Sequence, residues 1–236
     1  MKKLLFLLFI TCITSLLHLN TQGKHLFILS GQSNMARLKP ELSFVPTLHA
    51  KYGKEKVLVV KDAQGGQPIR RWYRDWQPVE GIVSENRANL YKRLMGKVYE
   101  AIDNQKIATI TFIWMQGERD AKESNGVVYE ESLLGLYEQL SKDLKRNDIH
   151  FIIGRLSDFD LQNKKSPHWT MIREVQVKVA QSNPLFDWVN TDDLNDGLDK
   201  KQRLLKNGLH MSIEGYKIMG VRFAEKAIEL VEKRNQ

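Results

Sequence analysis

Ser33 and His210 are the two residues of this chain whose types and settings best suit nucleophilic catalysis. Ser33 stands in the segment GQSNM at residues 31–35, directly after an apolar run at 26–29. His210 ends the segment GLH at 208–210, just before the last amphipathic stretch. A serine hydroxyl is a weak nucleophile at neutral pH unless a base takes its proton, and imidazole titrates in the range that this task requires. The pair predicts a serine hydrolase.

Two further clusters suit the stabilisation of an oxyanion. The glycine pair at 65–66 follows a second apolar run, and glycines present backbone N–H groups without side-chain obstruction. Gln116 follows a third apolar run, and its amide can also donate hydrogen bonds. An ordinary glycine turn is the alternative explanation for the first cluster, and a helix N-cap is the alternative for Ser33.

The elements that must position these residues alternate along the chain. Apolar runs predict five strands, and runs this apolar indicate a parallel sheet covered on both faces. Amphipathic stretches between them predict helices that each bury one face. We expect a three-layer αβα domain with a central parallel sheet of about five strands, whose carboxyl ends gather the polar clusters. The expected strands are 26–29, 57–60, 107–114, 149–153 and 186–189, and the expected helices are 86–102, 129–144, 171–180 and 213–231.

The N-terminus predicts export. A basic head, MKK, precedes a mostly apolar stretch at 4–19, and small residues follow at 21–23. This pattern is typical of a signal peptide, with cleavage near Gly23 and a secreted or periplasmic domain at 24–236. The apolar stretch is short for a membrane span, although a retained anchor is the alternative. Cleavage would also remove Cys12, the only cysteine, and with it any thiol catalysis or disulfide.

The charge distribution and the spacing of the histidines limit the classes of partner that we expect. The net charge is +8, yet the cations are interleaved with acids along helix-like stretches, which is typical of a solvated face and not of a nucleic-acid interface. No histidines have a metal-ligand spacing, so we expect no metal and no cofactor. The oligomeric state is not indicated.

Four blocks in order resemble the SGNH-hydrolase superfamily, most closely its sialate O-acetylesterase-like branch, which includes the acetyl xylan esterases of carbohydrate esterase family 6. The blocks are GQSNM at 31–35, GGQPI at 65–69 with Trp72, WMQGERD at 114–120, and GLH at 208–210 leading into EGY at 214–216. The resemblance implies a flavodoxin-like fold and removal of O-acetyl groups from sugars without a cofactor.

The resemblance also implies roles for individual residues. Ser33 would be the nucleophile and His210 the base, with Ser33, Gly66 and Gln116 forming the oxyanion hole. Substrate contacts would come from the remaining polar and aromatic positions of the blocks. Trp72 could stack on a sugar and Arg70 could pair with an acidic one, or both could simply pack at the surface. The candidate substrate-binding residues are Gln32, Asn34, Arg70 and Trp72.

One position departs from the family pattern. The family has an aspartate three residues before the histidine, where this chain has Asn207. That acid orients the imidazole and stabilises its charged form, and asparagine brings no charge. Glu118 would supply the charge instead, or the chain would be a weakened or non-catalytic sugar binder, or deamidation of Asn207 would create the aspartate. An upstream aspartate at 192, 193 or 196 is a further candidate.

The sequence therefore predicts a secreted carbohydrate O-acetylesterase acting on sialate or xylan-type esters. Its alternative is a catalytically weakened or non-catalytic carbohydrate-binding protein on the same fold.

Overall fold

The computed structural model describes residues 23–81 and 85–233. The predicted signal peptide, apart from Gly23, lies outside the described residues. The first described strand starts at Lys24, whose backbone N–H donates to the carbonyl of Lys106.

Five parallel strands form the central sheet in the order β2-β1-β3-β4-β5. This order is that of flavodoxin-like doubly wound folds. It confirms the predicted fold class. Each expected strand overlaps an observed one, and their ends differ by at most three residues. The strands are β1 (Lys24–Gly31), β2 (Val57–Ala63), β3 (Ile107–Met115), β4 (His150–Gly154) and β5 (Phe186–Val189).

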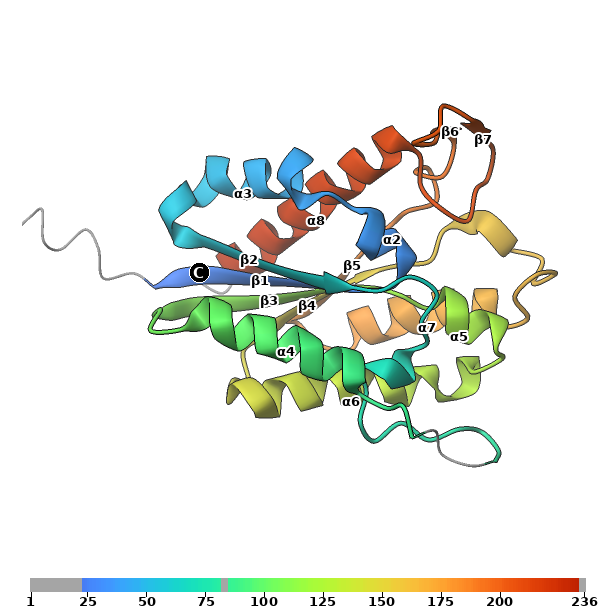
Figure 1. Ribbon diagram of the computed structural model, residues 1–236, viewed down its shortest axis with the longest axis horizontal. Helices are drawn as coiled ribbons and strands as arrows, with labels where there is room; N and C mark the ends of the chain where they lie inside the picture. The colour runs from blue at the N-terminus through green and yellow to red at the C-terminus, as the bar shows by residue number, and fades with distance from the viewer. Residues whose placement is uncertain (1–22, 82–84, 234–236) are drawn as a thin grey trace, which may run out of the picture.

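Helices cover both faces of the sheet, which makes three layers (Figure 1). One face carries α2 (Ser33–Arg37), α3 (Phe44–Tyr52) and α8 (Ile213–Lys233). The other carries α4 (Asn89–Ile102), α5 (Glu118–Lys122), α6 (Tyr129–Leu144) and α7 (Trp169–Gln181). Of the described helices, none is both long and apolar enough to cross a membrane.

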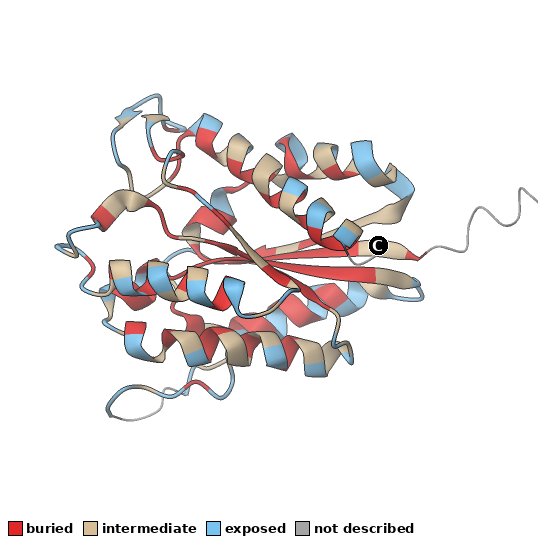
Figure 2. Cartoon of the chain, turned by 180° about the vertical axis from the view of Figure 1, so that it is seen from behind, coloured by how far each residue is buried: buried red, intermediate tan, exposed pale blue. Residues whose placement is uncertain are grey.

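Strand β1 shows why both layers form. Successive side chains of a strand point to opposite faces, so Leu26 and Ile28 enter the core beneath α4 and α6, while Phe27 and Leu29 enter the core beneath α3 and α8. All four are fully buried. Figure 2 shows the same pattern, with a buried sheet between helices whose outer sides are exposed.

Sequence patterns missed three kinds of element. Helix α3 has a weak apolar stripe, with only Phe44 and Leu48 buried. Helix α5 is a single turn that follows the end of β3, whereas the helix expected after Ser33 is present as the single turn α2. The third kind is an antiparallel hairpin, β6 (Gly197–Leu198) with β7 (Leu204–Leu205), whose strands are too short for an alternation to be read.

The reversal of strand order lies between β1 and its neighbours β2 and β3. Connections leave such a point toward opposite faces, and this opens a crevice at the carboxyl ends of the strands. Ser33 follows β1, Gly65 follows β2 and Gln116 follows β3, so three of the predicted clusters meet at this crevice.

Candidate active site

Backbone hydrogen bonds tie the three strand ends together. The N–H of Gln32 donates to the carbonyl of Met115 at 2.9 Å, and the N–H of Gln64 donates to the carbonyl of Gly31 at 3.0 Å. Gly31 has φ of +140°, and a Cβ there would lie 2.0 Å from the Met115 carbonyl oxygen. Only glycine fits this crossing, which fixes where the next residues of GQSNM leave the sheet.

Ser33 and His210 meet, although they come from opposite ends of the domain. Ser33 begins α2 and His210 lies in the loop before α8; the Nε2 atom of His210 is 3.1 Å from the Oγ atom of Ser33. Burial, together with the positive charge of Arg37, lowers the pKa of His210. A neutral imidazole at hydrogen-bond distance from a serine hydroxyl has the geometry of a general base and its nucleophile.

The glycine turn lies directly beside the serine. A Cβ built on Gly65 would lie 3.6 Å from the Cβ of Ser33. Gly66 has φ of +69° and open space where a side chain would be, and its backbone N–H has no hydrogen-bond acceptor among the described residues. The turn therefore leaves a backbone donor available next to Ser33, where an oxyanion hole would need one.

Gln116 does not offer a free donor, which differs from the expectation. Its side chain is fully buried, and its Nε2 atom lies near three acceptors: the Gln32 side chain at 3.2 Å, the Gln67 carbonyl at 3.1 Å and the Asp120 carboxylate at 2.6 Å. An amide nitrogen has two hydrogens, so these acceptors saturate it. Its Oε1 atom accepts from Tyr129. Gln116 holds the strand ends together and does not face an oxyanion.

Gln32 belongs to the same buried network. It is 3% exposed, and its Oε1 atom accepts from both the Gln116 amide and the backbone N–H of Arg119. The structure therefore places Gln32 behind the nucleophile, where it shapes the turn, and not on a substrate-facing surface.

Asn34 is also buried and joins three elements. Its Nδ2 atom donates to the Glu118 carboxylate at 2.9 Å and to the carbonyl of Leu209 at 3.2 Å. Its Oδ1 atom accepts from the Tyr216 hydroxyl at 2.8 Å. Leu209 immediately precedes His210, so Asn34 locks the histidine loop against α2 and α8. Its polar atoms are occupied, which places it as a positioning residue and not as a substrate contact.

Glu118 is linked to the Ser33–His210 pair only through Asn34. It is fully enclosed, and burial raises its pKa to about 7 despite the hydrogen bond from Asn34. Its second carboxylate oxygen has no hydrogen-bond partner. Asp120 lies nearby, and burial raises its pKa to about 6. Two buried carboxyls that interact disfavour each other's ionisation, so Glu118 is only partly ionised at neutral pH.

No carboxylate reaches the histidine ring in the part of the chain that the structure describes, where Ser33 is its sole hydrogen-bond partner. The Asn207 side chain is exposed and contacts Asn195 and the carbonyl of Asp158. Asn207 also adopts a left-handed backbone, at φ of +46°, which asparagine tolerates better than most residues. The structure thus forms a dyad, and the predicted roles of Glu118 and Asn207 as orienting groups on His210 have no contact to support them.

The upstream aspartates are engaged elsewhere. Asp192 pairs with Arg155 and Arg173, Asp193 pairs with Arg222, and Asp196 accepts from the backbone N–H of Asn207. None of the three contacts His210.

Trp72 and Arg70 are both engaged by other residues of the chain. Trp72 is fully buried and packs edge-on against Trp114 at 5.2 Å between ring centroids, so it cannot stack on a sugar. Arg70 forms an ion pair with Glu123 at 2.6 Å and lies over the ring of Trp76. The expectation that Trp72 stacks on a sugar is therefore wrong. An aromatic residue after a glycine turn can pack into the core as readily as it can face a crevice.

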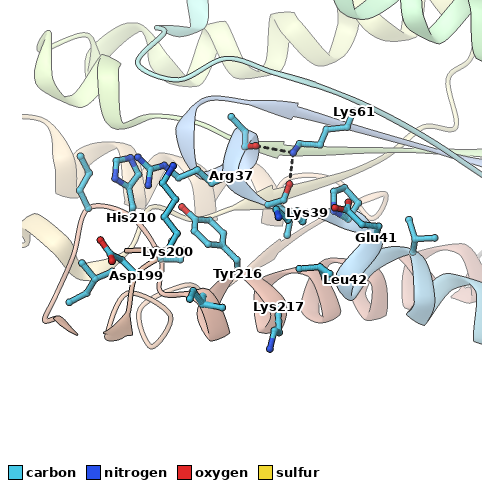
Figure 3. Close-up of a pocket in the computed structure, with 18 of the residues that line it drawn as sticks. Arg37, Lys39, Glu41, Leu42, Lys61, Asp199, Lys200, His210, Tyr216 and Lys217 are labelled. Atoms are coloured by element: carbon cyan, nitrogen blue, oxygen red, sulfur yellow. Dashed lines mark hydrogen bonds between the residues drawn. The ribbon is translucent and has the colours of Figure 1, made fainter. Parts of the chain in front are cut away.

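Two residues near the site were missed. Arg37 and Tyr216 line a cavity that reaches His210 (Figure 3). A signal existed for Arg37, because it lies four residues after Ser33 and hence one helical turn away if a helix begins at the serine. Tyr216 belongs to the EGY segment, but nothing in the sequence pairs its hydroxyl with Asn34.

Comparison with known proteins assigns the chain to a family. A family model described as "Carbohydrate esterase, sialic acid-specific acetylesterase" matches residues 36–229, most of the described domain. The chain belongs to this family. It is therefore a member of a carbohydrate acetylesterase family on the SGNH fold, as the four sequence blocks predicted. No curated protein matches the sequence.

Solved structures show the same fold at low sequence identity. A protein from Arabidopsis thaliana superposes with a TM-score of 0.66 at 18% identity, covering 88% of this chain and 99% of that one. NanS superposes with a TM-score of 0.60 at 14% identity, covering 90% and 99%. A carbohydrate acetylesterase from Xanthomonas citri gives 0.59 at 17% identity, covering 88% of this chain and 56% of that protein.

Proposed function

We propose that this member of the carbohydrate esterase family is a secreted serine O-acetylesterase that acts on acetylated sugars of the sialate or xylan type. The observation that carries the proposal is the 3.1 Å contact between the Nε2 atom of His210 and the Oγ atom of Ser33, beside a glycine turn with a free backbone donor. The family and the likeness to NanS and to the Xanthomonas citri acetylesterase support the acetylated carbohydrate.

The geometry supports a two-step reaction. Ser33 Oγ attacks the acetyl carbonyl carbon while its proton passes to Nε2 of His210. The backbone N–H groups of Ser33 and Gly66 stabilise the oxyanion. Collapse breaks the bond to the sugar oxygen, which takes the proton from His210 and leaves as the alcohol.

The second step regenerates the enzyme. Water attacks the acetyl group on Ser33 and gives a proton to His210. The tetrahedral intermediate then releases acetate, and the proton returns to Ser33. No cofactor takes part in either step. In place of a triad carboxylate, Asn34 and Glu118 position His210 through the carbonyl of Leu209.

The missing carboxylate favours a second candidate function. In the described residues no acid stabilises a protonated His210, so a carbohydrate-binding protein with weak or no turnover is the alternative.

Acetate release by the wild type, by Ser33→Ala and by the control Ser182→Ala distinguishes the two. Ser182 is an exposed serine at the end of α7. For an esterase, Ser33→Ala loses about four or more orders of magnitude in turnover, while Ser182→Ala retains it. Equal rates for Ser33→Ala and wild type would refute the esterase assignment, and sugar binding without turnover in all three would establish the alternative.

Export is a separate part of the proposal. The pattern at residues 1–23 supports it, and so does the start of β1 at Lys24. A reporter fused after residue 23 should leave the cytoplasm, with a mature N-terminus near Lys24. Retention of an uncleaved fusion inside the cell would refute export.

A further inference from the structure

A cavity of about 1060 Å³ opens beside His210, between the segment after β1 and the start of α8. Figure 3 shows His210, Arg37, Lys200 and Asp199 toward one end and Lys39, Lys61 and Glu41 toward the other. The volume is at the upper end of what small-molecule sites use, so a sugar with substituents fits. Cations outnumber acids in its wall; the cations are Arg37, Lys39, Lys61, Lys200, Arg203 and Lys217, and the acids are Glu41 and Asp199.

Several of these cations are already engaged. Lys217 pairs with Glu214 at 2.9 Å, and Arg203 pairs with Asp199 at 2.6 Å. The ammonium of Lys61 donates to two backbone carbonyls at the end of α2, and its burial lowers its pKa. These groups are neutralised or satisfied by the protein itself.

The side chains of Arg37, Lys39 and Lys200 have no ion pair or hydrogen bond with a described residue, and of these three only Arg37 carries a guanidinium. Its guanidinium makes no ion pair and no hydrogen bond with any described residue, although Figure 3 shows it directed to the His210 end of the cavity. Its charge acts on both His210 and Tyr216, lowering the pKa of the first and opposing the rise in pKa of the second. An arginine with five free donors is suited to bind a carboxylate in a bidentate manner.

The position of the cavity indicates which part of a substrate enters it. His210 lines the cavity, whereas Ser33 and the glycine turn do not. The base that takes the proton from Ser33 must later protonate the departing sugar oxygen, so the sugar lies on the histidine side. The acetyl group lies on the other side, toward Gly66. The cavity is thus the place of the leaving sugar.

We propose that Arg37 is the specificity-determining residue of this site and binds a carboxylate on the sugar that loses its acetyl group. This inference rests on the proposed function. Arg37 takes the role that the sequence suggested for Arg70, whose guanidinium pairs with Glu123. In that role Arg37 selects acidic sugars over the neutral xylan-type substrates.

The test compares one sugar in two charge states. kcat/KM for acetate release is measured on an O-acetylated sialic acid and on its carboxyl methyl ester, for the wild type, Arg37→Gln and the control Lys92→Gln. The wild type should prefer the free acid, and Arg37→Gln should reduce the acid-to-ester ratio by about ten- to a hundred-fold, as expected for a lost charged hydrogen-bonded pair. Lys92→Gln removes an exposed lysine of α4 that lies outside the cavity wall, so it should keep the wild-type ratio.

A wild type without preference for the acid, or an unchanged ratio in Arg37→Gln, would overturn the proposal. A binding measurement separates this from failure of the esterase assignment. Calorimetry on Ser33→Ala with deacetylated sialic acid and its methyl ester, repeated with Arg37→Gln added, reports the carboxylate contact without any turnover. If the wild type hydrolyses nothing yet Arg37 still discriminates the acid in binding, only the esterase assignment fails; equal binding of both ligands removes the role of Arg37.

Discussion

The two sides of Ser33 differ in how their polar groups are used. On the strand side, Gln32, Gln116 and Tyr129 are buried and bonded to one another, so this side is rigid and closed to ligands. On the cavity side, His210 is half-buried, Arg37 is exposed, and the guanidinium has no described partner. In the proposed mechanism, the residues that hold Ser33 in place are therefore separate from those that would bind the substrate, although both groups lie at the same sheet edge.

The largest effect should follow a change on the cavity side. Replacing His210 by asparagine removes the base, so turnover should fall by about four to six orders of magnitude, similar to the loss of the serine. Circular dichroism should show an intact fold, because His210 is not part of either core. A variant with more than a hundredth of wild-type turnover would show that another group takes the proton.

On the strand side, Trp72→Ala should reduce stability far more than it affects substrate recognition. Deleting a fully buried indole leaves a cavity, at a cost of about 3–5 kcal/mol of unfolding free energy. Urea denaturation measures this cost, and KM for the acetylated sugar in the folded fraction should stay near that of the wild type. A raised KM with unchanged stability would show that Trp72 contacts the substrate.

The link between the two sides is Asn34, and Glu118→Gln loosens it. A glutamine carbonyl can still accept from Asn34, but its NH2 group would replace a buried carboxylate oxygen that has no partner among the described residues. Turnover should therefore fall by about ten- to a hundred-fold, less than the loss of a triad carboxylate. Asn207→Asp should change turnover by less than about threefold, because residue 207 makes no contact with His210. A hundredfold gain from Asn207→Asp would show that the asparagine is a lesion and that the loop rearranges.

Stability should depend on pH through the buried carboxyls of the strand side. The pKa values of Glu118 and Asp120 are raised by burial to about 7 and about 6, above those of an unfolded chain. Their protonated forms therefore favour the folded state: this contribution is complete below about pH 4 and is lost as the pH rises through 6 to 7. Unfolding free energies measured from pH 4 to 8 should decline over that window, and Glu118→Gln should flatten the decline. A stability that rises with pH in both proteins would contradict the raised values.

The sequence predicted the sheet correctly because strands depend on local patterns, and the two residues it singled out, Ser33 and His210, lie at hydrogen-bond distance. Buried runs such as Leu26–Leu29 read as strands without reference to the rest of the chain, and Ser33 and His210 each stand in a recognisable segment. The site's remaining details depend on packing between distant segments. The pattern around Trp72 is the same whether the ring meets Trp114 or a sugar, and Gln116 has an amide whether three acceptors saturate it or none does.

Arg37 illustrates the opposite case. The sequence contains 36 lysines and arginines, and nothing in the composition distinguishes this one. Only the ion pairs of the others, such as Arg70 with Glu123 and Lys217 with Glu214, leave Arg37 as a free guanidinium beside His210. Recognition residues of this kind are identified by the partners they lack, which a sequence does not display.

The central claim is that His210 activates Ser33 as a nucleophile, and an organophosphonate that labels activated serines tests it most directly. Peptide mass analysis should find one label per chain on the peptide that contains Ser33. Labelling should slow as the pH falls through the lowered pKa of His210, and it should be nearly abolished in His210→Asn. Labelling of another residue, or labelling of Ser33 at the same rate in His210→Asn, would contradict the account.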